Sequence, residues 1–175
     1  MLGYDRHGMG YKKVGRGNVC PTTMNLPKIG IKHGICLGER NDPDIEGFWN
    51  ELDEVLHLTE VSLVDRFYYI CSQPVSAATF MYQNGTIADY KDANMKGIYE
   101  SMKHGTLAFG YIGIAEMCQA MFGKDHSEDE NVHRFALSVV EHISDWAKSA
   151  SERHNLNFGC YASPEFCGGL HSNVQ

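Results

Sequence analysis

The stretch from Val14 to Ile31, VGRGNVCPTTMNLPKIGI, places polar side chains that could do chemistry directly after a glycine-rich turn. Asn18 follows that turn, and its amide could hydrogen-bond a substrate hydroxyl without titrating; the alternative is that it only shapes the turn. Cys20 could be a nucleophile as a thiolate. No histidine or lysine adjoins it in sequence to lower its pKa, so we interpret it as a small buried thiol.

Two later segments also carry candidate side chains. His104 and Thr106 lie in the motif HGT ahead of an apolar run, where a lone histidine is either a ligand contact or a structural residue. Ser163 and Pro164 follow an apolar strand-like segment, and ligand-binding loops of α/β proteins follow parallel strands. A hydroxyl and loop amides there could hold a phosphate, although a plain exit turn is the alternative.

The histidines and cysteines do not form a metal motif. The chain has nine histidines and six cysteines, and they are scattered singly, without a C-x-x-C pair or an H-x-x-x-H pair. The sequence therefore predicts neither a metal site nor a disulfide framework, and we expect reduced thiols.

Composition restricts the class of protein. A length of 175 residues suffices for one domain with a core, and the net charge of −7 argues against nucleic acid as the main partner. No apolar run approaches the ~20 residues that span a bilayer, and the N-terminus has no apolar signal segment. We expect a cytoplasmic protein.

Hydrophobic periodicity predicts several elements in the first half of the chain. Residues 18 to 26 favour a short strand, and residues 28 to 38 are too rich in glycine for a regular element. Asp42-Pro43 is a typical helix start. Apolar residues then recur at steps of three and four from about 43 to 71, which indicates one long helix or two in sequence. A short helix is expected over 93 to 103.

The second half predicts an α/β arrangement. An extended segment beginning at His104 should pass into a helix that ends at Gly123. Ser127 and Glu130 match a capping box for the next helix, which should end near Asn155. A buried strand should follow. Helices with short strands between them, and no hairpins, favour a helix-rich α/β fold that is part of a larger structure; residues 1 to 17 read as a loop.

These segments together resemble one known family. GRGNVCPTTMNLPKIGI, NMKGIYESMKHGTLAFGYIGIAEMCQAMFGK and SERHNLNFGCYASPE resemble the large subunit of anaerobic (class III) ribonucleoside-triphosphate reductases. The family pattern runs G-R-G-N, T-x-N-L-P, then H-G-T-L with G-[FY]-I-G-[LI]-A-E, and finally N-L-N-F. The match covers residues 14 to 162 in order, and three ordered motifs are more specific than any one of them.

The resemblance implies a fold and a reaction. The expected fold is a ten-stranded α/β barrel, of which residues 1–162 would be a part and residues 163–175 a divergent tail. A glycyl radical would pass to a cysteine, whose thiyl radical takes the 3′-hydrogen of a ribonucleotide, and the 2′-hydroxyl leaves as water. The implied reductant is formate. The implied partners are the ribonucleoside triphosphate, a radical-generating activase that uses an iron–sulfur cluster and S-adenosylmethionine, and a second subunit of a homodimer.

The same resemblance suggests roles for single residues. Asn18 matches the asparagine near the substrate ribose, where an amide orients rather than titrates. Ser163 and Pro164 fall near the loop expected to bind the substrate phosphate. His104 and Thr106 match a motif of the substrate-binding region whose chemistry the residue types do not settle.

The departures from the family pattern set the alternatives. The family's thiyl cysteine lies in an M-G-C-R-T-like loop shortly before G-R-G-N, but here Met9-Gly10 is followed by Tyr11, and no cysteine precedes Cys20. We therefore expect the isolated chain to be inactive. A non-catalytic relative that binds nucleotide or a partner is the second hypothesis. A glycyl-radical enzyme of the formate-lyase kind is the third, and G-R-G-N and N-L-P argue against it.

Overall fold

A three-stranded parallel sheet forms the centre of the computed structural model, which describes residues 3–8, 10–12, 17–83 and 98–163. Its strands are β3 (Asn18–Asn25), β4 (Thr106–Ile112) and β5 (Asn157–Ala162), in the order β3-β4-β5. Because the central strand β4 pairs with both neighbours in parallel, the first residues of all three strands meet at one edge of the sheet. The α/β class predicted from the sequence is confirmed.

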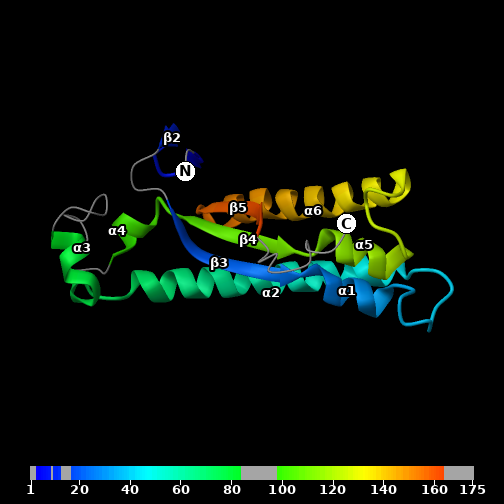
Figure 1. The fold of residues 1–175 in the computed structure, drawn as a ribbon. Coiled ribbons are helices and arrows are strands. Elements are labelled where there is room, and N and C mark those ends of the chain that lie inside the picture. Colours follow the sequence, from blue (N-terminus) through cyan, green and yellow to red (C-terminus); the bar gives the residue numbers. More distant parts are fainter. Residues whose placement is uncertain (1–2, 9, 13–16, 84–97, 164–175) are drawn as a thin grey trace, which may run out of the picture.

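Two long helices run alongside this sheet. Helix α2 (Ile45–Cys71) lies along β3, and α6 (Glu130–His154) lies beside β5 (Figure 1). The shorter helices are α1 (Leu26–His33), α3 (Thr79–Gln83), α4 (Tyr99–Met102), α5 (Ile114–Phe122) and a 3-10 helix, η1 (Val75–Ala78). None of the helices within the described ranges is long and apolar enough to cross a membrane.

The main hydrophobic core lies between the sheet and the long helices. Leu107 and Phe109 of β4 are fully buried in one cluster with Leu63 of α2 and Ile143 of α6. Alternate residues of β4 thus point to the helices, as the period of a strand requires. The apolar stripes predicted for 43 to 71 and for the last long helix are the faces that enter this core.

A buried carboxylate ties α2 to α6. Glu60 of α2 accepts hydrogen bonds from Trp146 Nε1 at 2.7 Å, from Arg153 Nη2 at 2.6 Å and from His154 Nε2 at 2.7 Å. Burial by itself would raise the pKa of Glu60, but these hydrogen bonds outweigh it and hold the pKa below the ordinary glutamate value. The network therefore stabilises the ionised form of the Glu60 carboxylate.

Some local predictions are wrong. The described residues 3–8 and 10–12 are not a loop, because β1 (Gly3–Asp5) and β2 (Gly10–Lys12) pair as an antiparallel hairpin. The segment expected to be irregular forms α1, whose start is capped by the Asn25 side chain accepting from the Lys28 amide. The cap of α6 is Asp129 and not Ser127, since the Asp129 carboxylate accepts from the Asn131 amide while the Ser127 hydroxyl bonds Asp125.

The other element predictions fare better. The helix expected from 43 to 71 is one helix, but it begins at Ile45, and its cap is not Asp42 but Asp44, whose carboxylate accepts from the Gly47 amide at 2.8 Å. The helix expected to end at Gly123 ends there. Of the helix expected over 93 to 103, residues 93 to 97 lie outside the described part, and the described turn is α4. The last long helix ends at His154, next to Asn155, whose φ of 50° is left-handed.

Gly34 allows α1 and α5 to approach each other closely. A Cβ at this position would lie 2.1 Å from the backbone oxygen of Ala120, which itself accepts from the amides of Ile35 and Cys36. Gly34→Ala is therefore expected to push the two helices apart and to lower the free energy of unfolding by about 2 kcal/mol.

Urea unfolding followed by circular dichroism measures this effect. Gly17→Ala is the control, because no atom lies within 4 Å of a Cβ built there. Equal midpoints of urea unfolding for Gly34→Ala and the wild-type chain would show that α1 and α5 are not closely packed at Gly34.

Candidate functional site at the amino ends of the strands

Three polar residues stand in one row where the parallel strands begin. Asn18 of β3 pairs in register with Thr106 of β4, and Thr106 pairs with Asn157 of β5. Asn18 is exposed, whereas Thr106 and Asn157 are buried, and the Thr106 amide donates to the Gly17 carbonyl at 2.7 Å. The structure thus brings together Asn18 and Thr106, which the sequence named separately, and adds Asn157.

His104 lies beside this row and is bound to a carboxylate of the hairpin. Its Nδ1 is 2.7 Å from Oδ2 of Asp5, and both residues are buried. Burial alone would raise the pKa of Asp5, but hydrogen bonds from His104 and Asn157 hold this pKa below its usual range. An ionised carboxylate only accepts, so the proton of this hydrogen bond is on His104 Nδ1.

Asn157 completes this cluster and links it to the hairpin backbone. Its Nδ2 donates to Asp5 Oδ1 and to the Lys103 carbonyl, both at 3.2 Å, and its Oδ1 accepts from the Arg6 amide at 2.8 Å. Sequence reasoning missed Asp5 and Asn157 as site residues. Asn157 was within reach, because it lies in the N-L-N-F motif, but nothing local marks Asp5, whose partners are 99 and 152 residues away.

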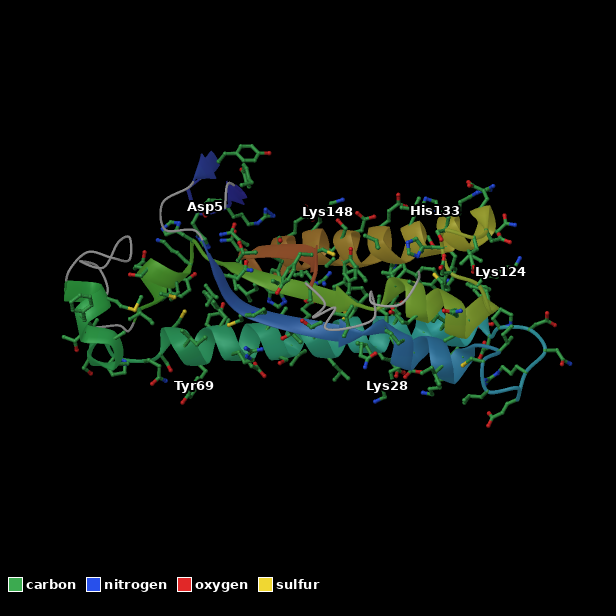
Figure 2. All side chains as sticks on the ribbon, viewed as in Figure 1. Asp5, Lys28, Tyr69, Lys124, His133 and Lys148 are labelled. Atoms are coloured by element: carbon green, nitrogen blue, oxygen red, sulfur yellow. The ribbon has the colours of Figure 1, made fainter. Side chains whose placement is uncertain are left out.

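Ser163 lies at the opposite edge of the sheet. Its hydroxyl is 2.8 Å from Oγ1 of Thr23, across Gly110, where a Cβ would come within 2.8 Å of the serine oxygen. Six residues of extended chain separate Ser163 from Asn157, or roughly 20 Å. In Figure 2, the labelled Asp5 lies by the hairpin, whereas the labelled Lys28 lies in α1, which follows the carboxyl end of β3.

A hollow opens next to Ser163 at this second edge. It has a volume of about 180 Å³ and is lined by residues 111–114 with Ala162 and Ser163. The prediction that Ser163 binds substrate phosphate remains a prediction, and so do those for His104, Thr106 and Asn18. Pro164 lies outside the described residues.

Cys20 belongs to the core, as the sequence led us to expect. Its side chain is fully buried, and burial raises the pKa of its thiol. Burial also raises the pKa of Cys71 to about 12 and that of Cys118 to about 11. These three thiols are neutral and enclosed, which is unsuitable for a nucleophilic or redox-active cysteine.

Comparison with known proteins defines the class to which this parallel α/β segment belongs. The family model described as anaerobic ribonucleoside-triphosphate reductase matches residues 3–165. The chain therefore belongs to the anaerobic ribonucleoside-triphosphate reductase family. The relatives from Haemophilus influenzae and Escherichia coli K12, both named anaerobic ribonucleoside-triphosphate reductase, are 26% and 28% identical over 153 residues. Each alignment covers 86% of this chain and 20% of the relative, so the chain spans about a fifth of their length.

Solved structures agree with this fold. The anaerobic ribonucleotide reductase of Thermotoga maritima with citrate in the active site superimposes with a TM-score of 0.61 over 91% of this chain and 26% of that one, at 18% identity. The same enzyme in complex with dATP and CTP gives 0.57 over 85% of this chain and 22% of that one, at 17% identity. At these identities the likeness concerns the fold.

Proposed function

We propose that the chain is a segment of the catalytic barrel of an anaerobic ribonucleoside-triphosphate reductase and that its strand amino ends face the substrate ribose. The observation that carries this proposal is the exposed Asn18, aligned with Thr106 in a segment that matches the family from residue 3 to residue 165. The parallel sheet and its likeness to the Thermotoga maritima reductase support a place in a larger α/β barrel.

In this proposal the chain's residues bind and orient the nucleotide. The Asn18 amide can donate to one ribose hydroxyl and accept from another, and it stays neutral at every pH of interest. Ser163 is too far away to touch the same ribose, so it would serve the triphosphate end of the nucleotide, next to the hollow at residues 111–114. Orientation of this kind lowers the barrier by reducing the freedom of the bound substrate.

The radical chemistry would come from outside the described residues. A glycyl radical, generated by an iron–sulfur and S-adenosylmethionine activase, supplies the one-electron chemistry for which formate is the reductant. The core encloses the thiols of Cys20, Cys71 and Cys118, so none of these three can contact a ribose. The chain's contribution is therefore binding, positioning and exclusion of water, in a full-length enzyme that we propose to be a homodimer.

The isolated chain is expected to form no deoxynucleotide from CTP or ATP, even with activase, S-adenosylmethionine and formate, because the thiol of Cys20, two residues from Asn18 in β3, is fully buried. Anaerobic incubation followed by chromatography of the nucleotides measures this directly. A reductase from Escherichia coli, treated in parallel, is the positive control. Deoxycytidine or deoxyadenosine nucleotides formed by this chain would contradict the prediction.

One observation favours a second candidate, a non-catalytic nucleotide-binding or partner-binding relative. Tyr11 stands where the resemblance places the thiyl cysteine. Calorimetry separates the two candidates. Tight binding of ribonucleoside triphosphates by the isolated chain favours the relative, and weak binding favours the enzyme segment, because a segment that spans about a fifth of the relatives' length supplies only part of their contacts.

A further inference from the structure

We propose that Asp5 and His104 form a positioning pair that docks the hairpin β1–β2 onto the amino ends of β4 and β5. In this inference His104 acts on the hairpin through the Asp5 carboxylate. It goes beyond the proposed function, which leaves the part played by His104 open. Docking as such requires no nucleotide, and only its consequence for the reaction rests on the proposed function.

The contacts between hairpin and sheet are polar and reciprocal. The Asp5 carboxylate accepts from His104 Nδ1 at 2.7 Å, from Asn157 Nδ2 at 3.2 Å and from the amide of His7 at 3.2 Å. In return, the backbone amide of Arg6 donates to Asn157 Oδ1 at 2.8 Å, and the side-chain Nε of Arg6 donates to the Ser151 carbonyl at 2.9 Å. The turn of the hairpin is thus bonded to β5, to α6 and to the loop before β4.

Apolar burial does not explain how the hairpin is held. Its two strands have three residues each, and a two-stranded hairpin of that size is not stable by itself in water. Tyr4 and Tyr11 pack on each other edge to face, but they are 54% and 74% exposed. Asp5, by contrast, is fully buried. The buried carboxylate and its charge-assisted hydrogen bonds therefore anchor the hairpin.

The contact between the rings of His7 and His104 agrees with this arrangement. The two rings meet edge to face with their centroids 6.1 Å apart, so His104 contacts the hairpin with its ring as well as with Nδ1. Burial lowers the pKa of His7, and the positive charge of Lys103 lowers it further. The lowered pKa favours the neutral ring, which packs beside His104 while the backbone amide of His7 donates to the Asp5 carboxylate.

The loop from Lys103 to Thr106 joins the hairpin to Asn18. His104 in this loop binds Asp5, and Thr106 at its end pairs with Asn18. Strand β2 of the hairpin contains Tyr11, the position at which the resemblance places the thiyl cysteine. If the proposed function holds, one short loop therefore fixes both the hairpin and the ribose-orienting asparagine.

Amide hydrogen exchange of the chain, followed by NMR, tests the docking. In the Asp5→Asn and His104→Ala variants, we expect the Arg6 amide and the hairpin amides to exchange about tenfold faster or more, because a hydrogen bond to a charged group is lost. Protection in β3, β4 and β5 should stay at the wild-type level. Asp53→Asn is the matched control, because Asp53 of α2 pairs with His142 of α6 at 2.6 Å, away from the hairpin.

A conservative variant separates the effect of the hydrogen bond from the effect of side-chain volume. In His104→Asn the side-chain NH₂ takes the place of Nδ1 and can still donate to Asp5, so this variant should recover most of the protection that His104→Ala loses. Unchanged hairpin exchange in Asp5→Asn and His104→Ala would overturn the proposal. Equal exchange in His104→Asn and His104→Ala would also overturn it, and so would loss of protection throughout the sheet, because the pair would then hold the core. None of these outcomes depends on nucleotide binding.

Discussion

Phe109→Ala is expected to lower the free energy of unfolding by about 4 kcal/mol, the largest effect of any change considered for this chain. Phe109 lies in the middle of the central strand β4, is fully buried, and has its ring centroid 5.7 Å from that of Phe158. Truncation removes the transfer free energy of a benzyl group and leaves a cavity between the sheet and the helices, which a strand paired on both sides cannot close.

Chemical denaturation monitored by circular dichroism measures this loss. Phe80→Ala removes the same atoms from α3, where the ring is 74% exposed, and should change stability by less than about 0.5 kcal/mol. Since a domain of ordinary stability has only about 5–15 kcal/mol, the Phe109 variant should be visibly less stable at room temperature. Similar midpoints for the two variants would mean that β4 does not form the centre of the core.

Glu60→Ala is expected to cost about 3 kcal/mol, because it removes the carboxylate to which Trp146, Arg153 and His154 all donate. The indole N–H of the half-buried Trp146 and the guanidinium of Arg153 would then lose their partner. Arg153 is partly exposed and can turn to water, which keeps the expected loss from being larger. Glu54→Ala is the matched control, since Glu54 is exposed on the same helix.

The loss should depend on pH in a defined direction. The folded pKa of Glu60 is lowered, so its stabilisation is fully present above the ordinary glutamate pKa of about 4.3 and is lost as the pH falls through the folded value. The difference in unfolding free energy between the wild-type chain and Glu60→Ala should therefore be constant near neutral pH and narrow in acid. A difference that stays the same down to pH 3, or that grows, would refute the role of the ionised carboxylate.

The sequence predicted the elements whose pattern is periodic. The stripe from 43 to 71, the stripe of α6 and the strands around Cys20 and Leu107 carry their apolar residues at the spacing of the element they form. It failed for α1 because Gly30 and Gly34 looked like breakers. In the structure they are small because α5 packs directly against them, with the Met117 oxygen 2.9 Å from a Cβ at Gly30. Because the need for a small residue at these positions comes from tertiary packing, no pattern in the local sequence indicates it.

The candidate site likewise contains residues that a local motif marks and residues that only the tertiary structure reveals. Asn18, His104 and Thr106 were found because they lie in short motifs, and the register of β3 and β4 then brings Asn18 and Thr106 together. Asp5 could not be found, because a lone aspartate in a glycine-rich segment has no periodicity, and its partners are distant in the chain. That Ser163 and Asn18 lie at opposite ends of the sheet also required the structure, because it depends on the three strands pairing in parallel.

A titration of the chain with CTP, followed by proton–nitrogen correlation NMR, tests the central claim most directly. The account predicts that CTP shifts the amide signals of residues 17–19 and 104–106, and that these shifts are lost in Asn18→Ala but kept in Asn50→Ala, which alters an exposed asparagine of α2. Shifts confined to the outer faces of α2 and α6, or shifts at residues 17–19 that persist in Asn18→Ala, would contradict the claim that the strand amino ends bind the ribose.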